Sequence, residues 1–129
     1  MGSDTSARSR SRSATKRLTS AQVLIAIAIL EVLADPTRLR IVHALLAGPR
    51  SVTGLAKTAR VSASAISHQL RRLREQRIVN FDRDGTTVNY RLTDEHIARF
   101  CREALYHADH VVTGLSRRRS AAISRRAKS

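Results

Sequence analysis

The sequence predicts a mainly helical fold that carries one β-hairpin and pairs with a second copy of itself. Three observations lead to this prediction. Apolar residues recur with helical spacing over five segments, and two strand-like runs flank an Asp84-Gly85 turn. The first helical segment is apolar on nearly every side. A chain of 129 residues gives room for one small domain with tails.

The first helix is expected over residues 20–34. A helix that is apolar all round is buried all round, and a domain this small cannot cover every face by itself. A second subunit is therefore expected, which makes an intertwined homodimer. The second helix begins with Asp35 as N-cap and Pro36 at its first position, and it stops at Gly48-Pro49.

The remaining elements follow in a recognisable order. They are a short helix over 52–59, a turn at Arg60-Val61, a longer helix over 62–76, strands over 78–83 and 86–92, and a last helix from Thr93 or Asp94 to about Gly114. Asp-Gly between two such strands is a strong hairpin signal, because the two-residue turn needs positive φ. Short helix, turn, longer helix and hairpin together are the winged helix-turn-helix arrangement.

The charge is large and uneven. Lys and Arg number 24 against 10 Asp and Glu, a formal net charge of +14. Residues 1–17 hold five cations and one acid, and residues 113–129 hold six cations and no acid. Residues 1–17 and 116–129 are expected to be disordered basic tails around a domain over 18–115. Such a balance favours a polyanion partner, nucleic acid first and an acidic membrane surface second.

The helix over 62–76 has two unlike faces. Ala63, Ile66, Leu70 and Leu73 form an apolar stripe. Small polar residues in the first two turns of the other face would let the helix approach base edges, and the arginines further on would reach phosphates or guanine. The hairpin tip would contact an adjacent minor groove or the backbone. The candidate DNA-binding residues are Ser64, Ser67, His68, Arg71, Arg72 and Arg83.

Three of the five histidines lie in the last helix. At 100° per residue His96, His107 and His110 fall within an arc of about 60°, at one border of the apolar face. His96 and His107 are separated by about 16 Å along a helix, which is too far for one metal ion. Two antiparallel copies would bring Asp94 and His96 of one subunit to His107 and His110 of the other, giving two equivalent sites per dimer. Three imidazoles and one carboxylate suit Zn²⁺ or Co²⁺.

Simpler interpretations exist for each of these features. The histidines could be scattered over a solvated face, and the helix over 62–76 could be an ordinary amphipathic helix. His43 is expected at the core or its boundary. Cys101 excludes an intramolecular disulfide and fits a reducing cytosol, and its place in the apolar face favours a buried thiol over a redox sensor.

The sequence also resembles a known family. The blocks that carry the resemblance are Val32-Leu33-Ala34-Asp35-Pro36-Thr37-Arg38-Leu39-Arg40-Ile41, Ser64-Ala65-Ile66-Ser67-His68-Gln69-Leu70-Arg71-Arg72-Leu73-Arg74 and Tyr90-Arg91-Leu92-Thr93-Asp94-Glu95-His96. They resemble the ArsR/SmtB family of metal-responsive repressors over about residues 20–115. That resemblance implies a dimeric winged helix-turn-helix protein that binds operator DNA when metal-free and releases it when metal binds.

The resemblance also bears on the sites. By position, Asp94, His96, His107 and His110 match the zinc- and cobalt-type pattern, and Ser64, Ser67 and His68 match base-reading positions. The segment around His107 and His110 is similar to nickel and cobalt sensors too, which use further histidines. Here the comparable places hold Val112, Arg119 and Ser3, so nickel is kept as a second possibility.

The function expected is a metal-responsive DNA-binding transcriptional regulator, a repressor that leaves its operator on binding zinc, cobalt or nickel. The alternative is a metal-blind DNA-binding regulator, or an activator that acts with a partner protein. No enzyme is expected, because no nucleophile–base pair or phosphate-cradling glycine loop occurs. A cytoplasmic location and no membrane partner are expected, since the uncharged run over 18–30 is too short to span a bilayer.

Overall fold

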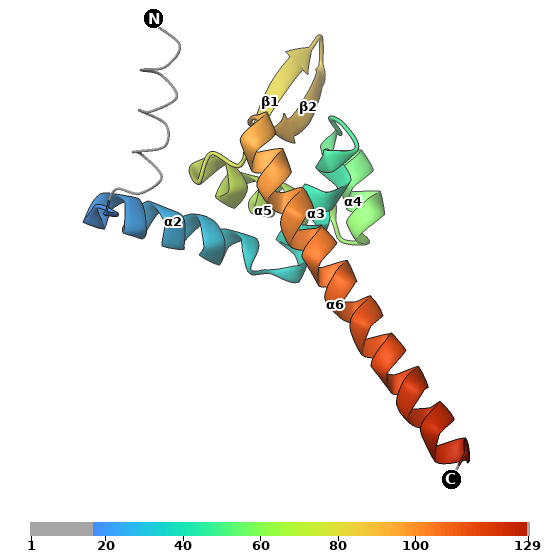
Figure 1. The fold of residues 1–129 in the computed structure, drawn as a ribbon. Coiled ribbons are helices and arrows are strands. Elements are labelled where there is room, and N and C mark those ends of the chain that lie inside the picture. The colour runs from blue at the N-terminus through green and yellow to red at the C-terminus, as the bar shows by residue number, and fades with distance from the viewer. Residues whose placement is uncertain (1–16, 129) are drawn as a thin grey trace, which may run out of the picture.

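The structure is a computed structural model that describes residues 17–128 (Figure 1). Its elements in chain order are α2 (Ser20–Leu33), α3 (Pro36–Leu46), α4 (Val52–Ala59), α5 (Ala63–Glu75), β1 (Val79–Asp84), β2 (Thr87–Leu92) and α6 (Glu95–Lys128). The predicted fold class, mainly helical with one hairpin, is confirmed. The N-terminal tail, predicted over residues 1–17, lies almost wholly outside the described residues.

Side chains just before the helices set where they begin. Thr19 and Gln22 form a reciprocal capping box at the start of α2. The carboxylate of Asp35 accepts a hydrogen bond from the Arg38 amide at 3.0 Å, and Pro36 occupies the first turn of α3, as predicted. Helix α3 ends at Leu46, and Gly48 follows with a φ of 142°, so the predicted stop is confirmed.

One small core joins α3, α4, α5 and the base of the hairpin. Its largest fully buried side chains are Ile41, Leu55, Ile66, Leu70, Leu73, Ile78 and Val42. Of the apolar stripe predicted on α5, Ile66, Leu70 and Leu73 pack inward, whereas Ala63 at the start of the helix is exposed. Cys101 joins the same cluster and, together with Ala98, holds the first turns of α6 against it.

The hairpin is a two-stranded antiparallel sheet with Val79 opposite Leu92 and Asp84 opposite Thr87. Gly85 in the turn has a φ of 63°, which explains why glycine follows Asp84 there. Arg50 makes an isolated bridge to Tyr90, with amide-to-carbonyl distances of 2.9 and 2.8 Å in the two directions. This bridge fastens the α3–α4 connection to the base of the hairpin, and no sequence pattern indicated it.

Helix α2 projects from the body and has no buried residue (Figure 1). Ile29, Val32 and Leu33 at its C-terminal end pack against the core, whereas Leu24 is 69% exposed and Leu30 is 53% exposed. A single chain therefore leaves uncovered the apolar faces that the sequence predicts to be buried.

Helix α6 is longer than predicted. It does not end near Gly114 but continues to Lys128, so residues 116–128, predicted as a disordered tail, are helical. Helix propensity explains the difference, because alanine and arginine are strong helix formers and no proline interrupts the segment. The far part of the helix extends beyond the body of the domain (Figure 1).

Within residues 17–128 no single helix has the length and apolar content to cross a membrane. Helices α2 and α3 together meet that requirement, but they are bent by 92° at the break between them.

Candidate functional site: nucleic-acid interface and metal ligands

Helices α4 and α5 form a helix-turn-helix. Arg60 ends α4 in the left-handed conformation with a φ of 57°, and the Val61 amide donates to the Ala56 carbonyl at 3.2 Å. Ser62 then caps α5 by accepting a hydrogen bond from the Ala65 amide at 3.1 Å. The turn is thus closed by hydrogen bonds on both sides, which fixes the direction in which α5 leaves it.

The outward face of α5 carries the predicted DNA-binding residues. Ser64, Ser67, His68, Arg71 and Arg72 are all exposed, while Ile66, Leu70 and Leu73 on the opposite side are buried. The five residues are therefore accessible on one face of α5 in the single chain. Their contact with bases or phosphates stays a prediction.

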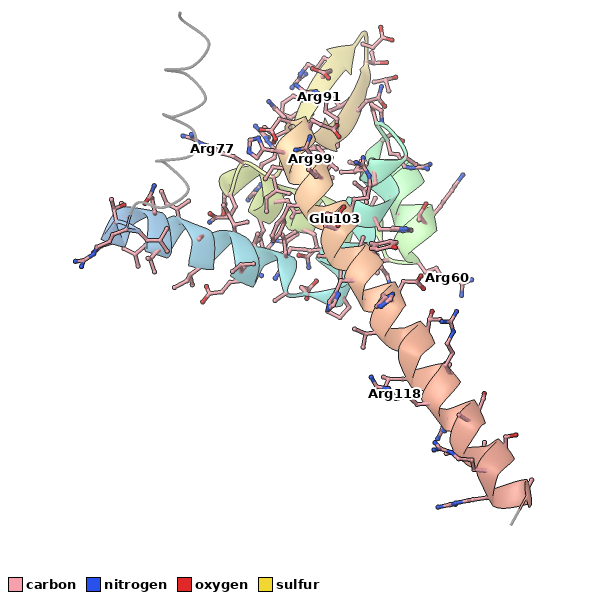
Figure 2. All side chains as sticks on the ribbon, in the orientation of Figure 1. Arg60, Arg77, Arg91, Arg99, Glu103 and Arg118 are labelled. Carbon is pink, nitrogen blue, oxygen red and sulfur yellow. The ribbon has the colours of Figure 1, made fainter. Side chains whose placement is uncertain are left out.

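Helix α5 passes directly into the hairpin. Arg77 has a φ of 57°, and the Ile78 amide donates to the Leu73 carbonyl at 3.0 Å, which closes the end of α5 as a Schellman motif. Figure 2 labels Arg77 at this junction. Because Ile78 is also a core residue, the hairpin is held at a fixed angle to the candidate recognition helix.

Two arginines flank one aromatic ring in the hairpin. The guanidinium carbon of Arg74 lies 4.4 Å from the ring centroid of Phe81, and that of Arg83 lies 5.8 Å away. The Phe81 and Tyr90 rings are 5.6 Å apart. The predicted contact residue Arg83 is thus joined by Arg74, which sequence reasoning missed because the contact depends on how the hairpin folds back on α5.

A buried arginine connects three helices behind this face. Arg38 is 8% exposed, and its Nη1 donates to Oε1 of Gln69 on α5 at 2.8 Å. Its Nε donates to the Val32 carbonyl at the end of α2. Helix α2, helix α3 and the candidate recognition helix are therefore tied together by one side chain.

Asp94 and His96 form the first of two pairs of candidate metal ligands. His96 Nδ1 lies 2.9 Å from Asp94 Oδ1, and the two side chains are 80% and 40% exposed respectively. Asp94 Oδ1 also accepts a hydrogen bond from the Ile97 amide at 3.0 Å, so this carboxylate caps α6. The cap holds one carboxylate and one imidazole together at the start of the helix.

His107 and His110 form the second pair, exposed on the middle of α6. Since α6 is one continuous helix, His107 lies about 16 Å along the axis from His96. In keeping with this separation, no three His, Cys, Asp or Glu side chains of the described residues gather at one place. One chain therefore brings together each pair but not the four residues.

The other histidines and the cysteine lie elsewhere. His43, expected at the core or its boundary, is exposed on α3, so that prediction was wrong. Cys101 is buried, as predicted, and its burial raises the pKa of the thiol. A raised pKa keeps the thiol protonated and unreactive, which argues against redox sensing.

The helix-turn-helix followed by a hairpin defines a winged helix-turn-helix protein, the class of DNA-binding transcription regulators predicted above. Residues 35–80 match the family described as bacterial regulatory protein, arsR family. The HTH-type transcriptional regulator NmtR of Mycobacterium tuberculosis (strain ATCC 25618 / H37Rv) is 45% identical over 93 residues, which cover 72% of this chain and 78% of NmtR. The chain belongs to the ArsR family.

Solved structures agree with this assignment. The solution structure of apo-NmtR superposes with a TM-score of 0.63 at 41% identity, covering 74% of this chain and 81% of that one. The antimony-specific transcriptional repressor AntR superposes with a TM-score of 0.67 at 34% identity, covering 77% of this chain and 91% of that one. The DNA-binding domain of Mb0332 from Mycobacterium bovis is described as a homodimeric winged helix-turn-helix. It superposes with a TM-score of 0.68 at 27% identity, covering 77% of this chain and 93% of that one.

Proposed function

We propose that this chain is a homodimeric repressor that binds operator DNA when metal-free and releases it when a divalent transition metal binds between its subunits. Asp94 and His96 of one subunit and His107 and His110 of the other would hold each ion. The observation that carries the proposal is the arrangement of these residues as two exposed pairs on one helix, too far apart for one ion within a chain.

Apolar surface left uncovered in the single chain supports dimerisation. Leu24 and Leu30 on α2 and Phe100 and Val112 on α6 are between 46% and 69% exposed. Exposed apolar faces of this kind mark an interaction surface, and a two-fold pairing of α6 with its copy would cover them while joining the ligand pairs. The Mb0332 domain, which is similar in fold, is described as a homodimer.

The chemistry of the donor set fits a transition metal. Three imidazoles and one carboxylate make a four-coordinate nitrogen and oxygen set suited to Zn²⁺ or Co²⁺, with Ni²⁺ as the second choice. His96 Nδ1 faces Asp94 Oδ1 at 2.9 Å, so one imidazole and one carboxylate of the set already converge. The antimony-specific repressor AntR supports response to an inorganic ion within the same family.

Operator recognition would rest on α5 and the hairpin. Ser64, Ser67 and His68 occupy the exposed first two turns, where a helix approaches base edges, and Arg71, Arg72 and Arg83 would contact phosphates or guanine. In a dimer the two copies of α5 must be spaced by about 34 Å to fit successive major grooves on one face of the DNA.

The path from metal to DNA runs through packed elements. The start of α6 is anchored by Ala98 and Cys101, and α6 contacts both α3 and β2. Arg38 on α3 bonds Gln69 on α5. A metal that fixes the two α6 helices relative to each other would therefore change the spacing of the α5 helices. About 1.4 kcal/mol of such coupling weakens operator binding tenfold.

The test is an operator titration resolved by metal. A duplex selected from a random library with the metal-free protein would be titrated alone and with Zn²⁺, Co²⁺ or Ni²⁺. We expect at least one metal to weaken binding by about tenfold or more, and the variant H107A/H110A to bind equally with and without metal. Equal affinity of the wild-type chain under all four conditions would favour a metal-blind regulator and refute the proposal.

A further inference from the structure

The part of α6 beyond Gly114, residues 115–128, is not used by the proposed metal or operator sites. We call residues 116–128 the basic arm. Side chains 115–127 are all exposed, and the arm extends past the body of the domain, where Figure 2 labels Arg118. We propose that the basic arm is a second nucleic-acid surface, which contacts backbone phosphates of double-stranded DNA irrespective of sequence.

The charge of the basic arm supports a polyanion partner. It carries Arg117, Arg118, Arg119, Arg125, Arg126 and Lys128, and no acid follows Asp109 in the chain. Side chains of unlike charge three or four residues apart would stabilise a helix, but the arm has none to offer. Phosphates from a partner would reduce the repulsion among these like charges and stabilise the helical form.

The distribution of cations around the arm distinguishes DNA from a membrane or a second copy. An interfacial membrane helix keeps one face apolar, and a dimer seam does the same. The apolar face of α6 reaches Val112 and Leu115, but Arg119 and Arg126 fall on its continuation at 100° per residue. The cations of the arm span an arc of about 200°, and the remaining face carries serine and alanine with Ile123 as its one large apolar side chain. The arm therefore has no continuous apolar face, and its cations are spread widely enough to meet phosphates along both walls of a groove.

The dimensions of the arm also fit the major groove of double-stranded DNA. Thirteen helical residues extend about 20 Å, and a helix about 10–12 Å across matches the width of a major groove. Arg117, Arg118 and Arg119 point about 100° apart, so consecutive arginines reach phosphates on different sides.

The place of the arm depends on the proposed function only through the pairing of α6 helices. If His110 of one subunit lies beside Asp94 of the other, Arg117 lies about 10 Å further along, past the start of the partner's helix. The hairpin strand β2 ends at Leu92, directly before that start. Each arm would then leave the dimer next to the other subunit's hairpin and add phosphate contacts outside the region read by α5.

The experiment measures how salt weakens binding of the full-length protein to an unrelated duplex of about 30 base pairs, with chelator present, between about 50 and 200 mM salt. The variant R117Q/R118Q/R119Q/R125Q/R126Q removes charge while keeping good helix formers. The matched control R117K/R118K/R119K/R125K/R126K keeps the charge. If each glutamine-substituted arm no longer binds about three phosphates, the slope of log K against log salt should shrink by about 5 per dimer.

The control should keep the wild-type slope, and far-ultraviolet circular dichroism should show equal helix content in all three proteins. An unchanged slope in the glutamine variant, or an equal loss in both variants, would overturn the proposal. A membrane role would also overturn it. In that case the wild type and the lysine control would bind phosphatidylcholine–phosphatidylglycerol vesicles, the glutamine variant would not, and the duplex slope of the glutamine variant would be unchanged. Because metal and operator are absent, failure here is distinct from failure of the metal-responsive function.

Discussion

Arg38 Nη1 donates a hydrogen bond to Gln69 Oε1 at 2.8 Å, and this contact links α3 to the helix that carries the candidate base-reading residues. Arg38 is 8% exposed and also bonds the Val32 carbonyl of α2. Arg38 and Gln69 are 31 residues apart in the sequence, so this buried guanidinium positions α3 and α5 against each other. The contact therefore sets how α5 is presented relative to the uncovered face of α2.

We expect R38M to lower the free energy of unfolding by about 1–3 kcal/mol, because it leaves the Gln69 amide and the Val32 carbonyl without their partner. R38K keeps the charge but not the planar fork, so it should recover only part of this stability. Urea unfolding measures both effects. A double-mutant cycle with Q69M measures the coupling energy between Arg38 and Gln69. A coupling energy near zero would contradict a positioning role for this contact.

Two glycines should respond in opposite ways to alanine. A Cβ added at Gly114, inside α6, meets no atom within 4 Å, so G114A should stabilise the helix by about 0.5–1 kcal/mol. Gly85 has a φ of 63° in the hairpin turn, where alanine is strained, so G85A should destabilise by about 1 kcal/mol. Thermal unfolding of the two variants checks both signs. A loss of stability in G114A would show that α6 does not continue as a helix through this point.

Much of the fold could be predicted because its signals are local. Asp35 and Pro36 begin α3, Gly48 follows its end, and the alternation of faces on α5 needs only the spacing of Ile66 and Leu70. These features depend on the backbone chemistry of neighbouring residues and on helical periodicity, both of which are visible in the sequence.

The features that the sequence did not predict depend on tertiary contacts or on helix propensity alone. Arg38 is a charged residue whose burial follows from partners 6 and 31 residues away. The position of Arg74 over Phe81 requires the hairpin to fold back on α5. The basic arm lacks apolar periodicity, so its pattern predicted a tail although its residues favour a helix. The proposed metal site would take its four ligands from two chains, and one chain shows them only as two pairs.

The buried thiol of Cys101 should make the free energy of unfolding fall as the pH rises into the alkaline range. Burial raises the pKa of this thiol in the folded chain above its unfolded value. Its contribution is present in full below the unfolded pKa and is lost as the pH rises through the folded pKa. We expect the urea midpoint to fall more steeply at alkaline pH in the wild type than in C101A, and labelling by a thiol reagent to need unfolding. Rapid labelling of the folded protein at neutral pH would contradict this.

Residues that read bases and residues that hold phosphates should differ in their effect on sequence preference. Ser67 lies exposed in the second turn of α5, and Arg72 lies exposed one turn further on. S67A should lower the preference for the selected operator over an unrelated duplex by about 1 kcal/mol or more. R72Q should weaken both duplexes similarly and reduce the salt slope by about 1 for each contact. Competition binding measures the ratio, and an unchanged preference in S67A would remove Ser67 from the reading face.

Mixed dimers test whether each metal site takes ligands from two subunits. The variant D94N/H96A loses one pair while asparagine keeps the α6 cap that Asp94 provides, and H107A/H110A loses the other pair. Neither variant alone should bind Co²⁺ at the site. In an equal mixture half of the dimers combine both variants, and each of these has one intact site. We therefore expect about one quarter of the wild-type Co²⁺ absorption, because the two-fold pairing gives the wild type two sites per dimer. Recovery of none of the absorption, with exchange of subunits verified, would place the ligands within one chain or elsewhere.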